Sequence, residues 1–136
     1  MKNTECLIFM DEKNRSRLFE ERLTKFSEKT LFFCRSAKGN FLMRSLISQL
    51  IRSATSIGAN YCEANNASSK KDFRNRIFIC KKEAKETEYW LRLLKTAWPE
   101  RKDEINDLFQ ECHEFTLIFQ KIISTLKAKE RMISEK

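Results

Sequence analysis

The sequence predicts an all-α protein, built as an antiparallel up-down four-helix bundle. Four stripes of apolar or small residues recur at alternating steps of three and four, each over about three heptads, which is the spacing of one helix face. The chain contains only two glycines and one proline, whereas a β-sandwich needs many turn residues. No apolar run approaches the roughly 20 residues of a membrane-spanning helix, so we expect no membrane contact.

The first two helices are predicted by two stripes that are separated by a turn signal. The first stripe comprises Phe19, Leu23, Phe26, Thr30, Phe33 and Ala37, and the second comprises Met43, Ile47, Leu50, Ala54, Ile57, Tyr61 and Ala64. Between them, Gly39 can close the first helix in a left-handed conformation, and Asn40 can cap the second.

The third and fourth helices follow from two longer stripes. These comprise Phe73, Ile77, Cys80, Ala84, Thr87, Leu91, Leu94 and Trp98, and then Ile105, Leu108, Cys112, Phe115, Phe119, Ile122 and Leu126. Ser69 with Asp72 resembles a capping box, and Pro99 either ends the third helix or lies in the first turn of the fourth. Because the connections are short, sequential helices should be antiparallel neighbours within one domain of residues 1–136, with the bundle over about 14–130 and short tails.

The composition bounds the location and the chemistry. Five cysteines are scattered without CxxC spacing, which indicates free thiols, some of them buried, in a reducing compartment; we expect a cytoplasmic protein without metal or cofactor. The formal charge is +8, which favours an anionic partner but is weak evidence alone.

The second helix is poor in charge on both sides. From Ser45 to Cys62 only Arg52 is charged, in a chain that is 34% charged. A helix that avoids charge all round is usually covered all round, and a four-helix bundle covers only one side, so we expect a second subunit on the other. The alternative is a merely polar outward side. The residues expected at this subunit interface are Ser45, Gln49, Ser56, Ala59, Asn60 and Glu63. An ordinary solvated side is expected on the third helix, at Lys81, Lys82, Lys85, Glu86, Glu88 and Arg92.

Arg52 would be a lone charge in a covered place, and such a guanidinium needs an acidic partner. Glu63 lies about 16 Å along the helix axis, too far to reach. Glu83 or Glu86 on the third helix is the better partner, and we interpret Arg52, Glu83 and Glu86 as a structural ion pair.

Three stretches together resemble a known family. They read LISQLIRSATSIGANYCEA, SSKKDF and KKEAKETEYWLRLL, and they are similar to the four-helix bundle proteins described as 23S ribosomal RNA intervening-sequence proteins. The resemblance covers roughly residues 15–97. The family pattern falls on Gln49, Arg52, Ser56, Ile57, Asn60, Glu63, Ser69, Lys70, Phe73 and Glu86. It implies a homo-oligomer, a five-membered ring or pentamer, and relatives that bind nucleic acid and a reverse transcriptase as accessory proteins of diversity-generating retroelements.

The sequence offers no catalytic constellation. His113 is the only histidine, and the Glu-x-x-His pattern of di-iron bundles is missing because Gln110 stands three residues before it. There is neither a glycine-rich phosphate loop nor a serine elbow. We expect no enzyme and no catalytic residues.

A basic segment follows the charge-poor helix. Residues 70–85 contain two acids and seven bases, namely Lys70, Lys71, Arg74, Arg76, Lys81, Lys82 and Lys85, and a second basic cluster lies near the end of the fourth helix. In an antiparallel bundle both clusters meet at one end, where they suit phosphates. Only Phe73 and Phe78 are interleaved, which favours backbone binding over base reading. Two hypotheses stay open: an oligomer that binds RNA or DNA, and a scaffold for a protein partner such as a reverse transcriptase.

Overall fold

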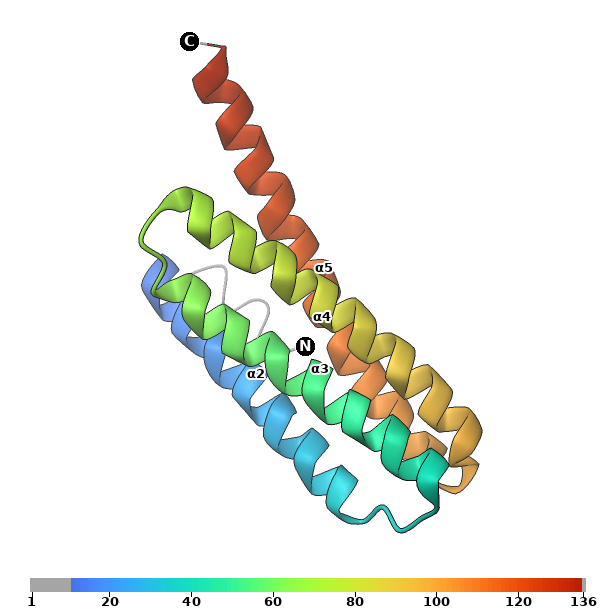
Figure 1. Ribbon diagram of the computed structural model, residues 1–136. Helices are drawn as coiled ribbons and strands as arrows, with labels where there is room; N and C mark the ends of the chain where they lie inside the picture. The colour runs from blue at the N-terminus through green and yellow to red at the C-terminus, as the bar shows by residue number, and fades with distance from the viewer. Residues whose placement is uncertain (1–10, 136) are drawn as a thin grey trace.

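The computed structural model describes residues 11–135 and contains four long helices (Figure 1). They are α2 (Glu12–Arg35), α3 (Phe41–Asn65), α4 (Lys70–Ala97) and α5 (Lys102–Ser134), with the 3₁₀ turn η1 (Pro99–Arg101) between the last two. No strand occurs within residues 11–135. The predicted all-α, up-down bundle is confirmed. Over the same residues, no helix is long and apolar enough to cross a membrane.

The core forms where the four stripes meet. Its fully buried side chains include Leu23, Leu50, Ile57, Ile77, Leu91, Leu94, Ile105, Leu108, Phe115, Phe119 and Ile123. The fourth stripe differs from the prediction at its end, because Ile123 is buried whereas Ile122 is only partly buried. A strict seven-residue repeat drifts around a straight helix, so the inward position moves by one residue after a few turns.

The helices do not pack equally against one another. α3 packs on α2 and α4, α4 also packs on α5, and α2 and α5 touch only sparsely. Aromatic rings fill the seam between α2 and α5, where the Phe19 ring lies 5.9 Å from Phe115 and 5.4 Å from Phe119. Arg22 of α2 closes the seam by donating to Glu111 of α5 at 2.8 Å.

The helix ends confirm two predicted caps and correct one prediction. The side chain of Asn40 accepts the Met43 N–H, and the Ser69 hydroxyl accepts the Asp72 N–H. The prediction for Gly39 is wrong, because no glycine within residues 11–135 has a positive φ. α2 ends earlier, at Arg35, with Ser36 in a right-handed conformation. A glycine still suits position 39, since a Cβ there would lie 2.8 Å from the Met43 Cβ.

Pro99 is the first residue of η1, between the end of α4 at Ala97 and the start of α5 at Lys102, whereas the prediction placed it at the end of the third helix or in the first turn of the fourth. The C-terminal part of α5 projects beyond the other three helices (Figure 1), and Met132 and Ile133 are exposed there, whereas Lys127 and Glu130 still contact side chains of α4.

The four cysteines within the described residues are free thiols. Burial raises the pKa of Cys34 to about 11 and that of Cys80 to about 12, and it also raises the pKa of Cys112. These three side chains therefore behave as small apolar groups in the core at neutral pH. Cys6 lies outside the described residues.

Candidate nucleic-acid interface

One side of α4 collects most of the basic residues that were predicted to bind an anion. Sequence steps of three and four residues place six lysine or arginine side chains on this side of the helix, with two aromatic residues between them. We name it the basic face of α4, which comprises Lys71, Arg74, Phe78, Lys81, Lys82, Lys85, Tyr89 and Arg92. It begins at the helix N-terminus, where the Ser69 cap holds the first turn and free backbone N–H groups add positive potential.

The acids of α4 all point elsewhere. Glu83 and Glu86 contact Arg52 of α3. Glu88 is buried against α5, and Asp72 accepts the Ser68 hydroxyl at the start of the helix. Each carboxylate is thus used away from the basic face, which keeps that face positive along its length.

Four of the seven predicted anion-binding bases are exposed without an ion pair to any residue from 11 to 135: Lys70, Lys71, Lys82 and Lys85. The other three are engaged within the chain. Arg74 pairs with Glu130 at 2.6 Å, and Lys81 donates to Gln120 of α5. Arg76 lies off the basic face and pairs with Glu63 of α3 at 2.7 Å, so it contributes least to an anion site.

The end of α5 adjoins the basic face. Lys127 places its ammonium 5.6 Å from the centre of the Phe78 ring, and Glu130 receives Arg74. The two basic clusters of the sequence therefore do lie at one end of the bundle.

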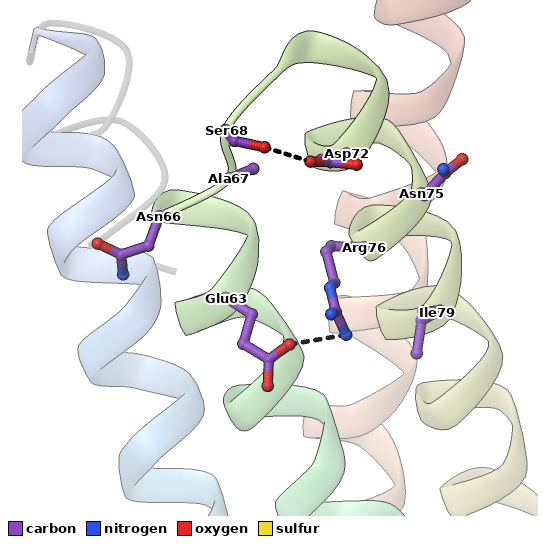
Figure 2. A pocket seen from close by; sticks show the side chains of 8 residues that line it. All are labelled: Glu63, Asn66, Ala67, Ser68, Asp72, Asn75, Arg76 and Ile79. Carbon is purple, nitrogen blue, oxygen red and sulfur yellow. Dashed lines mark hydrogen bonds and ion pairs between the residues drawn. The ribbon is translucent and has the colours of Figure 1, made fainter.

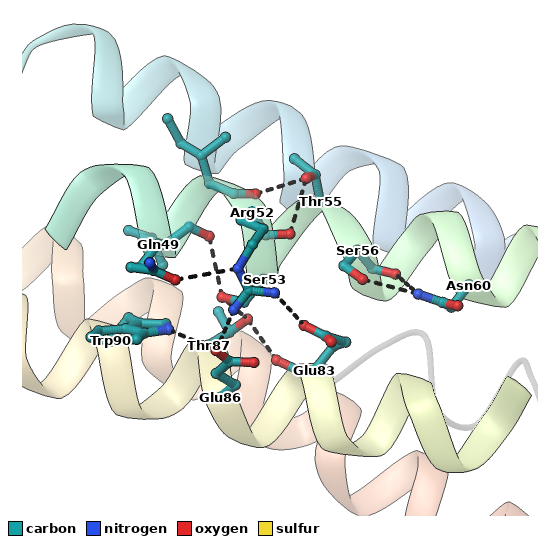
Figure 3. Close-up of polar contacts among 12 residues, drawn as sticks. Gln49, Arg52, Ser53, Thr55, Ser56, Asn60, Glu83, Glu86, Thr87 and Trp90 are labelled. Atoms are coloured by element: carbon teal, nitrogen blue, oxygen red, sulfur yellow. Dashed lines mark hydrogen bonds and ion pairs between the residues drawn. The ribbon is translucent and has the colours of Figure 1, made fainter. Parts of the chain in front are cut away.

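Arg52 lies between α3 and α4 among several polar groups (Figure 3). Its guanidinium contacts Glu86, and it lies 3.4 Å from a carboxylate oxygen of Glu83 and 3.3 Å from the side-chain amide oxygen Oε1 of Gln49. Trp90 donates its indole N–H to Glu86 at 3.3 Å. The Arg52 side chain is 49% exposed in the single chain, while Glu83 is 12% exposed. The acids chosen from the sequence are thus the ones that Arg52 contacts.

The residues predicted for a subunit interface form the outward row of α3, defined as Ser45, Gln49, Ser56, Ala59, Asn60 and Glu63. None of them belongs to the core. Asn60 donates to the Ser56 carbonyl and hydroxyl oxygens at 2.8 and 2.9 Å, and Glu63 pairs with Arg76. This row therefore presents short side chains whose polar groups are partly satisfied within the chain.

An open hollow of about 610 Å³ lies between the end of α3 and the start of α4 (Figure 2). Its lining residues are Glu63, Asn66, Ala67, Ser68, Asp72, Asn75, Arg76 and Ile79. The single guanidinium there is paired with Glu63, and Asp72 adds a second carboxylate. Two carboxylates disfavour an anion, so the candidate interface is the basic face of α4 and not this hollow.

The sequence analysis misplaced one acid and left two residues of the basic face out of the predicted anion site. Glu88 was expected on a solvated side, but it is buried at 8% exposure. Thr116 donates to one of its carboxylate oxygens at 2.7 Å, and His113 Nδ1 lies 2.8 Å from the other. Tyr89 and Arg92 lie beyond the basic segment 70–85, although their helical spacing would have placed them on the same face.

The chain matches the model of the 23S rRNA-intervening sequence protein family over residues 22–123. It belongs to this family. The match to the 23S rRNA-intervening sequence protein model includes most of α5, beyond the stretch 15–97 that the sequence motifs covered. It also includes the outward row of α3 and the basic face of α4.

One solved structure similar to this 23S rRNA-intervening sequence protein is a protein of unknown function of the S23 ribosomal protein family from Bacteroides thetaiotaomicron. It is 30% identical, with a TM-score of 0.68, and the match covers 76% of this chain and 96% of that chain. None of the curated proteins compared with the chain matches it.

Proposed function

We propose that this protein is a non-enzymatic homo-oligomer that binds the backbone of RNA or DNA through the basic face of α4. The observation that carries the proposal is the separation of charge on α4: six bases share one side, and all four acids of the helix are engaged elsewhere. Bases held on a rigid helix attract phosphates without regard to sequence, because the backbone charge is the same at every nucleotide.

Assembly would multiply this attraction. The resemblance to the family implies a ring of five subunits, in which each subunit adds one basic face. The outward row of α3, with its short and mostly neutral side chains, is the surface that we assign to the contact between subunits. Several faces on one particle raise the effective concentration of bases around a long strand.

The second candidate is a scaffold that binds a partner protein, for example a reverse transcriptase, and no nucleic acid. The near absence of charge on α3 favours it, because such a surface suits a protein partner as well as a second copy.

The test compares two triple variants that remove the same charge. Lys71, Lys82 and Lys85 are changed to Gln on the basic face, and Lys25, Lys29 and Lys38, all exposed, are changed to Gln as the control. Binding of fluorescent 30-nucleotide RNA and DNA is followed by anisotropy as salt is raised. We expect the first variant to lose at least tenfold in affinity and about 2 to 3 units of the salt slope, with the control close to wild type.

Equal losses of affinity in both variants would show that binding depends on the net charge of the protein and not on the basic face of α4. Wild-type protein that binds neither probe at low salt would leave the scaffold as the function.

A further inference from the structure

We propose that the basic face of α4 prefers single-stranded nucleic acid, because unpaired bases stack on Phe78 and Tyr89. This inference rests on the proposed function and adds the class of ligand. It requires two things of the structure: rings that are accessible from solvent, and positive charges beside each ring.

Phe78 meets both requirements. It is 39% exposed, although it lies on a helix that packs on both neighbours. Arg74 and Lys82 lie one turn to either side of it, and Lys127 of α5 holds its ammonium 5.6 Å from the ring centre. A nucleobase on this ring would have Lys82 and Lys127 within reach of its own phosphate and of the next, whereas Arg74 is paired with Glu130.

Tyr89 repeats the arrangement further along the helix. It is 54% exposed, and its ring packs edge-on against Trp90 at 5.2 Å, which restrains its orientation. Trp90 is restrained in turn, since its indole N–H donates to Glu86. Lys85 and Arg92 lie one turn to either side of Tyr89. The eleven residue steps from Phe78 to Tyr89 correspond to about 16 Å along the helix axis, a span of a few nucleotides.

This alternation of aromatic rings and basic side chains favours a single strand over a duplex. In a duplex the flat faces of the bases are stacked on one another, so the two rings could reach only the backbone. In a single strand every base offers a face, and stacking on an aromatic ring strengthens binding without demanding a sequence. A surface that bound only the phosphate backbone would not need half-exposed aromatic rings among its lysine and arginine side chains.

The experiment uses the intact protein and three labelled probes: a 20-nucleotide single-stranded RNA, the same sequence as single-stranded DNA, and its DNA duplex. The variant Phe78→Leu with Tyr89→Leu removes both rings but keeps apolar side chains and all charges. The matched control is Phe32→Leu with Phe41→Leu, which removes two rings that are 74% and 79% exposed, near the end of α2 and at the start of α3, outside the basic face. A third variant, Phe78→Trp, keeps a ring, and its added indole reports stacking through fluorescence quenching.

We expect wild type and control to bind both single strands more tightly than the duplex. Phe78→Leu with Tyr89→Leu should lose tenfold or more on the single strands and keep its duplex affinity and salt slope, and Phe78→Trp should bind single strands at least as well as wild type. Equal affinity of wild type for single strand and duplex, or unchanged single-strand binding in the leucine variant, would overturn the stacking proposal and leave backbone binding intact. Failure of wild type to bind any probe would overturn both.

Discussion

At the scale of single residues, Glu88 carries a buried carboxylate that needs hydrogen-bond partners inside the bundle. Both of its oxygens have a partner, since Thr116 donates to one at 2.7 Å and His113 Nδ1 lies 2.8 Å from the other. A buried acid is tolerated when its lone pairs are satisfied, and it becomes costly when a donor is removed. The pair of α4 and α5 is therefore held partly by polar contacts that need both helices in one register.

We predict that Thr116→Val destabilises the protein by about 1.5–3 kcal/mol, because a hydrogen bond to a charged group is lost while the shape of the side chain is kept. The control is Thr125→Val in the same helix, whose exposed hydroxyl donates only to the Lys121 carbonyl, with an expected change within about 0.5 kcal/mol. Urea unfolding followed by circular dichroism measures both. Similar costs for the two variants would show that the bond to Glu88 contributes little.

At the scale of helices, the two glycines make opposite demands. Gly58 lies inside α3, where it faces Leu23 and Ser27 of α2. A Cβ at position 58 would find its nearest neighbour at 3.7 Å, which is ordinary contact, whereas a Cβ at position 39 would clash with Met43. Gly58 therefore makes α3 less stable than an alanine would, although there is room for a Cβ. Gly39 is required because the loop approaches α3 too closely for a Cβ.

We predict that Gly58→Ala stabilises the protein by about 1 kcal/mol, because alanine loses less backbone freedom in a helix. Gly39→Ala should destabilise it, since the loop must shift away from the buried Met43. Thermal melting of the two variants side by side gives the comparison. A lower melting temperature for Gly58→Ala would mean that the close contact of α2 and α3 requires glycine.

At the scale of the whole molecule, the question is what covers the outward row of α3. We predict that the protein is oligomeric at micromolar concentration and that Ser56→Lys weakens the assembly, because the new ammonium would be buried without a partner. The matched control is Ser124→Lys on the exposed side of α5. Light scattering coupled to gel filtration gives the mass of each.

A monomeric mass for wild type would contradict the subunit interface. If Ser56→Lys assembled like wild type and like the control, Ser56 would lie outside the contact.

The amino-acid sequence alone predicts the four helices, the Asn40 and Ser69 caps, and the acids that contact Arg52. These features depend on spacing within a helix, on a cap that bonds three residues ahead, and on the register of two neighbouring helices joined by a short loop. For such interactions, the separation of two residues along the chain nearly determines the distance between their side chains in space.

Which side of α4 is covered by each neighbouring helix becomes known only when the helices are packed together. The rotation of α5 buried Glu88 against Thr116 and left Phe78 and Tyr89 exposed among the bases. Helix packing also placed Arg76 of α4 against Glu63 of α3, where the two side chains form an ion pair. These outcomes depend on how side chains from distant segments pack together. The helical period shows which residues share a face, but it does not show which neighbouring helix packs against that face.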